Sequence, residues 1–252
     1  MPLNINGNVV NSDIVKTFNY KSIVTRGLVL QVDAGALDSY PETGTSWSDI
    51  SGNNIITTLT NGPTFNSSNG GYIQFDGTDD FSSVTSVPAS LQGDPNITVC
   101  GFFRRTQTTI QSKGVWGIGG EATQSGINCW NYNNSNEITI DTWSTSTFSS
   151  GVTYPLNEWV FVAWQKIAGN MTRSNCIIWR NLVSYTGTQL SIIRGESGLP
   201  TINNYGITIG SISRTTGYCA GMGVGCLYIY NRILSSTEIT QNYNAQKSRF
   251  GL

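Results

Sequence analysis

The sequence contains no histidine among its 252 residues. Histidine is the usual general base of nucleophilic triads and the commonest zinc ligand in proteins. Its absence excludes Ser-His and Cys-His nucleophile pairs and argues against a zinc centre. We therefore expect a protein that binds other molecules and is not an enzyme.

Charge is also scarce, since Asp, Glu, Lys and Arg make up 12% of the chain, about half the share in a typical soluble domain. The 14 basic and 15 acidic residues leave a formal net charge of -1. Such a balance exerts no long-range attraction on nucleic acid or anionic lipid. We expect no nucleic-acid partner.

Long apolar runs are missing too. No stretch of about 18 apolar residues occurs, so the sequence predicts no membrane insertion. Residues 1–10 lack the basic start and apolar middle of a secretory signal, which predicts no export by that route.

The five cysteines are odd in number and show no CxxC spacing, which supports neither a zinc site nor a disulfide framework. Cys100 and Cys176 lie in apolar alternating runs, so we expect buried free thiols there. A link between Cys219 and Cys226 stays open at this stage.

Asn, Ser, Thr and Gly supply the polarity that charged residues do not, and these residues favour turns. Short alternating or apolar segments lie between the turn signals, a spacing typical of an all-β sandwich. The predicted strands are 27–33, 72–75, 81–84, 97–103, 114–120, 137–141, 159–164, 175–180, 207–210 and 226–230.

Two of these predictions are specific. An Asp76-Gly77 turn separates 72–75 from 81–84, which predicts a hairpin with Phe75 and Phe81 facing inward. Residues 159–164 are apolar on both faces, which predicts an interior strand covered on both sides.

One short helix is predicted near the C-terminus. Ser235 and Glu238 fit a capping box, and Ile239 and Tyr243 follow on one face. We expect this helix to seal a sheet edge or an end of the sandwich. Residues 1–26 are polar and irregular, and 27–252 form one domain. The first segment is either an anchoring arm or an ordinary edge strand with its lead-in.

Seven segments in order carry a family resemblance: 27–35, 46–53, 59–65, 75–81, 157–163, 207–210 and 227–235. Together they resemble the laminin-G-like branch of the concanavalin A-like lectin/glucanase superfamily. The resemblance implies an antiparallel β-sandwich of jelly-roll type. It leaves function open, because this fold hosts lectins, glycanases, adhesion modules and virion proteins.

An arm followed by one such domain is similar to structural proteins of tailed bacteriophages. This resemblance implies a virion structural protein: a capsid decoration, a neck or tail fibre, or an adhesin. Other virion proteins and further copies of the chain would be its partners, with host-surface glycans as a further ligand. It would be synthesised in the host cytoplasm and displayed on the particle. The alternatives are a free-standing carbohydrate-binding lectin module and a glycoside hydrolase.

Glu137, Thr139 and Asp141 should project from one face of a predicted strand. Glycanases of the similar fold carry their nucleophile and acid/base carboxylates on one strand in an E-x-D-x-x-E pattern. Thr139 replaces the central acid, and Asp141 stands at a spacing that the pattern does not use. We therefore predict no catalytic residues.

Tryptophans in Gly, Asn and Ser-rich surroundings are candidates for exposed rings that stack on sugars, and these are Trp116, Trp130 and Trp143. Trp130, Asn131 and Tyr132 combine aromatic faces with an amide and form the candidate carbohydrate-binding set. Packing in the core or at an interface is the alternative interpretation.

Asp76, Asp79 and Asp80 bring carboxylates together around one turn and form the candidate calcium site. Calcium usually takes six to eight oxygen ligands, more than this loop offers. Turn stabilisation by Asp side chains is the favoured interpretation, and no cofactor is expected.

Overall fold

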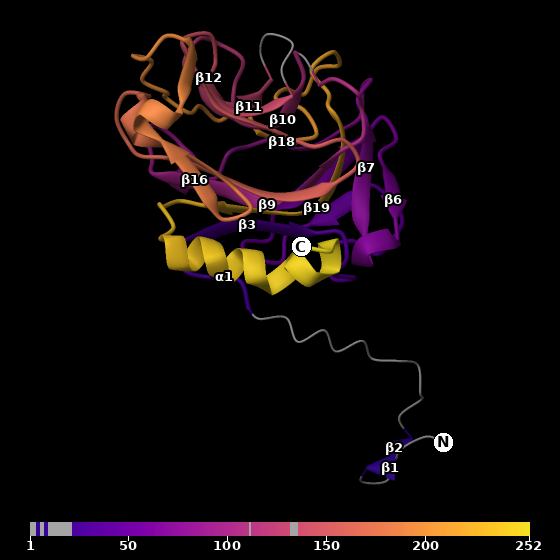
Figure 1. Ribbon diagram of the computed structural model, residues 1–252. Helices are drawn as coiled ribbons and strands as arrows, with labels where there is room; N and C mark the ends of the chain where they lie inside the picture. Colours follow the sequence, from indigo (N-terminus) through magenta and orange to yellow (C-terminus); the bar gives the residue numbers. More distant parts are fainter. Residues whose placement is uncertain (1–3, 6–7, 10–21, 111, 132–135) are drawn as a thin grey trace.

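The structure is a computed structural model that describes residues 4–5, 8–9, 22–110, 112–131 and 136–252 (Figure 1). Most of the expected arm, 1–26, lies outside the described residues. Within it, β1 (Asn4–Ile5) and β2 (Asn8–Val9) pair antiparallel.

The other strands of the described chain form two antiparallel sheets, which confirms the predicted β-sandwich. The nine-stranded sheet has the order β17 (Ser191–Arg194), β13 (Ser146–Thr153), β12 (Glu137–Thr142), β11 (Gly126–Trp130), β10 (Gly114–Gly119), β18 (Ile207–Ile209), β8 (Phe81–Val84), β5 (Ile56–Thr60) and β4 (Ser46–Ser48). The eight-stranded sheet has the order β16 (Val183–Thr186), β15 (Cys176–Arg180), β14 (Trp159–Lys166), β9 (Ile97–Arg105), β19 (Gly221–Tyr230), β7 (Tyr72–Asp76) and β6 (Thr64–Asn66), with β3 (Leu28–Asp33) also paired to β19.

The central strands of the eight-stranded sheet, β14, β9 and β19, are buried on both faces, and β14 shows this most clearly. Its even-numbered residues, such as Val162 and Trp164, belong to the core between the two sheets. Its odd-numbered residues, such as Phe161 and Ala163, belong to a second apolar cluster on the opposite face. β14 pairs with β9 on one side and β15 on the other, which confirms the predicted interior strand.

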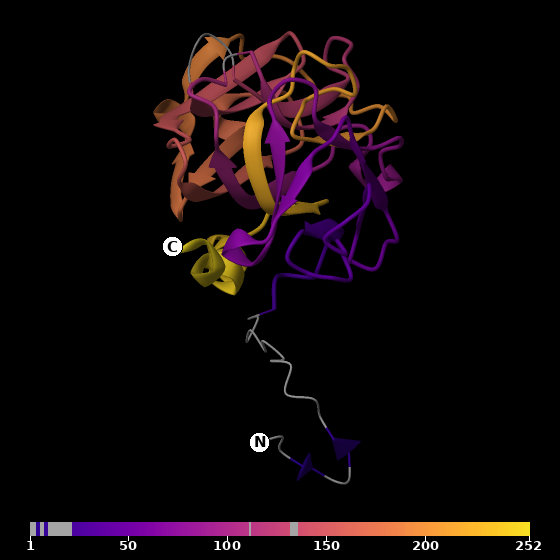
Figure 2. The same ribbon diagram turned by 90° about the vertical axis from the view of Figure 1, so that its right-hand side faces the viewer.

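The second apolar cluster is covered by α1 (Ser236–Gln246), which lies below β3, β9 and β19 in Figure 1 and below the strands again in Figure 2. The predicted capping box is confirmed: Ser235 Oγ accepts from the Glu238 N–H, and the Glu238 carboxylate accepts from the Ser235 N–H. Ile239 is buried, and the Tyr243 ring stacks on Phe102. The helix therefore covers a sheet face, and the expectation that it seals an edge or end is wrong.

The turn at Asp76–Asp80 does not form the predicted hairpin. β7 before it pairs with β19 and β6, whereas β8 after it pairs with β18 and β5 in the other sheet. The turn thus carries the chain from one sheet to the other. Phe75 belongs to the core between the sheets, as expected. Phe81 is also buried, but it lies on the same face of β8 as Ser83 and does not belong to that core, so its predicted inward orientation is wrong.

All five cysteines are buried free thiols, which confirms the expectation for Cys100 and Cys176. The link between Cys219 and Cys226 that the sequence left open is not formed. Among the described residues, none of the helices has the length and apolar character needed to cross a membrane.

The last part of the expected arm packs as part of the sandwich domain. The Val24 N–H donates to Asn242 Oδ1 over 2.9 Å, and the Tyr230 hydroxyl donates to the Val24 carbonyl over 2.9 Å. Gln241 Nε2 donates to the Ser22 carbonyl over 2.7 Å, and Val24 is 6% exposed. Residues 22–26 therefore belong to the folded unit, held against α1 and the end of β19.

Candidate functional site

A row of polar residues crosses the outer face of the nine-stranded sheet. Residues directly opposite one another in neighbouring antiparallel strands project from the same face. Their neighbours along each strand, such as Ile127, Ile140 and Phe148, fill the core on the inner face. Following the register across the sheet gives Arg194, Thr147, Asp141, Asn128, Gly117, Thr208, Ser83, Thr58 and Ser46.

Asp141 lies in this row and is fully buried. Burial raises the pKa of its carboxyl to about 6, although hydrogen bonds from Thr147 and Asn128 and the charge of Arg194 act in the opposite direction. The Asn128 Nδ2 donates to Asp141 Oδ2 over 3.2 Å. The Asn128 Oδ1 is buried and accepts no hydrogen bond from the described residues.

Three half-buried rings meet beside this part of the row, and we call Trp130, Trp143 and Tyr218 the aromatic corner. The Trp130 and Trp143 rings stack with centroids 5.8 Å apart and an interplanar angle of 25°. The Tyr218 ring stands nearly perpendicular to both, at 5.9 Å from Trp130 and 6.1 Å from Trp143. The Arg194 guanidinium lies 5.9 Å from the centre of the Trp130 ring.

Three different segments position these rings. Trp130 ends β11, Trp143 follows β12 at the turn into β13, and Tyr218 belongs to the 211–219 segment between β18 and β19. Aromatic rings that remain partly exposed next to hydrogen-bonding groups offer an apolar surface with polar contacts at its border. Most of the row is itself buried, and its half-buried member beside the rings is Arg194. Partly exposed rings next to a guanidinium suit a ligand that has both apolar faces and hydroxyl groups.

The structure separates the members of the predicted carbohydrate-binding set. Trp130 belongs to the aromatic corner, and Tyr132 lies outside the described residues. Asn131 is fully buried, and its amide donates to the Lys113 carbonyl over 3.4 Å, so it faces the protein's own backbone.

The two other candidate tryptophans differ. Trp143 is half-buried and joins the corner. Trp116 is 1% exposed and packs edge-on against Trp164, so the expectation of an exposed Trp116 ring is wrong. Tyr218 was not singled out from the sequence. It is an isolated tyrosine in a Thr/Gly segment, and its ring partners lie more than 70 residues away.

The acids of β12 are engaged by hydroxyl groups of β13. Ser149 Oγ donates to the Glu137 carboxylate, and Thr147 Oγ1 donates to Asp141. Thr139 Oγ1 donates to the Trp130 carbonyl over 2.7 Å. The residues that resemble a glycanase motif thus hold strands together and contribute polar groups to the sheet.

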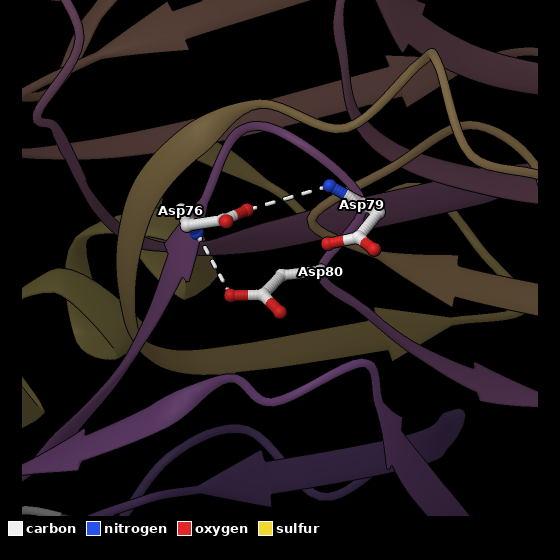
Figure 3. A group of neighbouring side chains, drawn as sticks. All are labelled: Asp76, Asp79 and Asp80. Atoms are coloured by element: carbon white, nitrogen blue, oxygen red, sulfur yellow. Dashed lines mark hydrogen bonds between the residues drawn. The ribbon is translucent and has the colours of Figure 1, made fainter.

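The carboxylates of Asp76, Asp79 and Asp80 gather at the turn between the sheets, with ligand atoms within 4.8 Å of one another (Figure 3). Asp76 Oδ1 accepts from the N–H groups of Thr78, at 2.7 Å, and Asp79, at 3.4 Å. Asp80 Oδ2 accepts from the Asp76 N–H over 3.0 Å.

The carboxyl groups at the two ends of this turn have pKa values shifted in opposite directions. Burial raises the pKa of Asp76, but backbone N–H donors outweigh burial, and the net pKa is lowered. Burial, with the charges of Asp76 and Asp79, raises the pKa of Asp80. The carboxylate oxygens are thus already used in shaping the turn, as the favoured interpretation expects. To hold calcium, these residues would need further oxygen ligands.

No protein-family model matches this sequence, and no curated protein matches it either. Solved structures share its fold. A Trypanosoma rangeli sialidase in complex with 2,3-difluorosialic acid has a TM-score of 0.62 at 14% identity, covering 90% of this chain and 34% of the sialidase. The chain therefore spans about a third of that protein.

Two further structures are similar over most of this chain. Domain 4 of AbnA, an extracellular GH43 arabinanase from Geobacillus stearothermophilus in complex with arabinotriose, has a TM-score of 0.58 at 14% identity, covering 87% of this chain and 98% of that one. The binding domain of botulinum neurotoxin DC in complex with rat synaptotagmin II has a TM-score of 0.57 at 15% identity, covering 90% and 52%. These likenesses establish the β-sandwich fold.

Proposed function

We propose that this chain is a carbohydrate-binding β-sandwich protein displayed on a bacteriophage particle. The observation that carries the glycan part is the aromatic corner: three half-buried rings from three segments, with the half-buried Arg194 guanidinium beside Trp130. Sugar rings present apolar C–H faces that stack on aromatic rings, and their hydroxyls need polar partners.

The similar structures add support for a glycan ligand. Domain 4 of the GH43 arabinanase was solved with arabinotriose, and the sialidase with a sialic acid derivative. Both ligands are saccharides, and domain 4 matches this chain over nearly its whole length. We therefore place arabinotriose and sialic-acid-terminated glycans first among the ligands to be tested.

The virion part of the proposal rests on the sequence resemblance and on the anchorage of residues 22–26. The hydrogen bonds to Ser22 and Val24 fix where the preceding chain leaves the sandwich, beside α1. A fixed exit point suits a segment that anchors the domain to a larger assembly. Other virion proteins and further copies of this chain are the proposed partners, and the particle surface is the proposed location.

A binding role without catalysis forms part of the proposal. Retaining glycoside hydrolysis needs two carboxyl groups about 5–5.5 Å apart, one of them poised as an acid. Asp141 has a raised pKa but is fully buried, and Glu137 accepts a hydrogen bond from Ser149, so the two carboxyl groups do not form an accessible pair of this kind. A free-standing lectin module is the second candidate, favoured by the same aromatic corner. It differs only in having no particle to join.

A glycan array tests the binding proposal. Wild-type protein should bind one or more glycans on an array that includes arabinotriose and sialic-acid-terminated chains. A Trp143→Ala variant should lose that binding while keeping its unfolding temperature. Absence of binding to every glycan would refute the carbohydrate role. Release of reducing ends from the bound glycan, abolished by Glu137→Gln, would refute the non-enzymatic role.

The particle proposal needs a separate test. Purified particles should contain this polypeptide, and light scattering should show that the full chain assembles while residues 22–252 alone remain monomeric. The shortened chain must begin at Ser22, because a start at Gly27 removes Val24 and its hydrogen bonds. Particles without the polypeptide would contradict the virion role. If the full chain and residues 22–252 are both monomeric, the free-standing lectin is favoured.

A further inference from the structure

The strand β10 offers no side chain on part of its outer face. Gly114 and Gly117 occupy positions whose side chains would point outward, since their partners Trp130 and Asn128 lie on the outer face of β11. The space is filled by Ile212, which is 4% exposed. A Cβ atom at Gly117 would lie 2.6 Å from the Ile212 carbonyl oxygen, and one at Gly114 would lie 2.6 Å from the Ile212 nitrogen.

The backbone of residues 211–219 therefore rests directly on the sheet, and hydrogen bonds fasten it there. Thr208 Oγ1 donates to the Ser211 carbonyl over 2.8 Å. The Gly114 N–H donates to the Tyr218 carbonyl over 2.6 Å. Ser211 and Ser213 are buried, although they lie outside the regular strands. Such a segment has one defined position relative to β10.

This position determines where the Tyr218 ring stands. The Trp130 and Trp143 rings are stacked on each other, whereas the plane of the Tyr218 ring makes angles of 74° and 82° with theirs. A pair of stacked rings alone would leave that side of the site open. Because the Tyr218 ring stands nearly perpendicular to the stacked pair, a ligand placed on those rings beside it would contact surfaces in two orientations.

We propose that Tyr218 is a specificity-determining residue of the glycan site and that Gly117 is the positioning residue that seats its segment on β10. The role given to Tyr218 rests on the proposed carbohydrate-binding function. The seating of residues 211–219 by Gly117 stands on the packing alone. A side chain at position 117 meets backbone rather than a flexible side chain, so the segment itself must move away from the sheet.

Hydrogen exchange on Gly117→Ala tests the seating. The amide of Gly114 should exchange at least tenfold faster than in wild type, because its acceptor on Tyr218 moves away. Near-ultraviolet circular dichroism should change with the altered ring arrangement. Gly223→Ala on β19 is the matched control, since its backbone is not in the left-handed region and the nearest atoms to a Cβ there belong to the Tyr72 and Gln74 side chains, not to residues 211–219. Unchanged exchange in Gly117→Ala would overturn the positioning role.

Glycan titration of Tyr218→Ala tests the specificity role, with arabinotriose and the tightest array ligand as probes. Tyr218→Ala and Gly117→Ala should each weaken the tightest interaction at least tenfold, and Tyr218→Ala should reduce the preference between probes. Wild-type affinity and preference in Tyr218→Ala would overturn the role of the ring. If wild type binds no glycan, the proposed function and the role of Tyr218 fail together, while the exchange result still decides the seating.

Discussion

Arg249 and Asp33 form a buried ion pair across 216 residues of sequence, with Arg249 Nη1 2.7 Å from Asp33 Oδ1. Their side chains are only 4% and 3% exposed. The same guanidinium donates to the carbonyls of Asn69 and Gly71. The C-terminal end of the chain is thus tied to the first strand of the sandwich and to the turn before β7.

Replacing Arg249 with methionine should lower the free energy of unfolding by about 3–5 kcal/mol, because Asp33 would remain as a buried charge without its partner. Urea denaturation would measure the loss. A double variant with Asp33→Asn should recover part of that free energy. If the free energy of unfolding lost by the double variant equals the sum of the losses in the two single variants, the ion pair does not couple these residues.

The contribution of Asp141 to the stability of the fold should fall as the pH rises, opposite to that of a carboxyl group whose pKa is lowered by folding. Its pKa is raised from 3.8 to about 6 by burial, so the folded protein takes up this proton more readily than the unfolded chain. Its contribution to stability is therefore fully present below about pH 4 and is lost as pH rises to about 6, a span of about 3 kcal/mol.

Asp141→Asn removes this titration, and the Asn128 amide can reorient to pair with the new side chain through its unused Oδ1. The free energy of unfolding of the variant minus that of wild type should rise by about 3 kcal/mol between about pH 4 and pH 6. It should then stay level up to pH 8. Urea titrations across this range would measure it, and a constant difference at every pH would contradict the burial of an ionised Asp141.

The carboxylates of Asp76, Asp79 and Asp80 should act through the turn and not through calcium. Asp76→Ala should cost about 1 kcal/mol of unfolding free energy, because two backbone N–H groups lose their acceptor. Calorimetric titration of EDTA-treated protein with calcium should give no binding heat and no thermal shift. Heat together with a thermal shift, both abolished by Asp79→Asn, would establish a calcium site instead.

The thiols should be inert in the folded protein. Burial raises the pKa of Cys100 and Cys176 to about 12 and that of Cys129 to about 11, and none of the five is exposed. A thiol reagent should therefore label no cysteine before denaturation and all five afterwards. Fewer reactive thiols after denaturation would reveal a disulfide, and rapid labelling of the native protein would contradict the burial.

Local signals in the sequence predicted the elements whose causes are local. The capping box of Ser235 and Glu238 formed as expected, because its hydrogen bonds join residues three apart. The residues of β14 alternate between two cores, as their apolar pattern indicated. The turn after Asp76 was also correctly located. Which sheet the following strand joins depends on distant strands, so the hairpin prediction failed there.

The candidate site was predictable only in part for the same reason. A local composition rich in Gly, Asn and Ser drew attention to Trp116, Trp130 and Trp143, but it does not encode which sheet face each ring occupies. The register between β10 and β11 shifts between Gly114 and Trp116, and Trp116 points into the core. Tyr218 belongs to a segment that packs on β10, where a Cβ at Gly114 or Gly117 would meet Ile212, and a local pattern cannot show this long-range contact.

The most direct measurement of the central claim is calorimetric titration of the tightest array glycan into Trp143→Ala and Trp179→Ala. Trp179 is a matched control because it is also half-buried but lies on β15 of the other sheet, where its indole donates to Gln165. We predict at least a tenfold weaker affinity for Trp143→Ala, about 1.4 kcal/mol, and wild-type affinity for Trp179→Ala. Wild-type affinity in Trp143→Ala, or an equal loss in both variants, would contradict a glycan site at the aromatic corner.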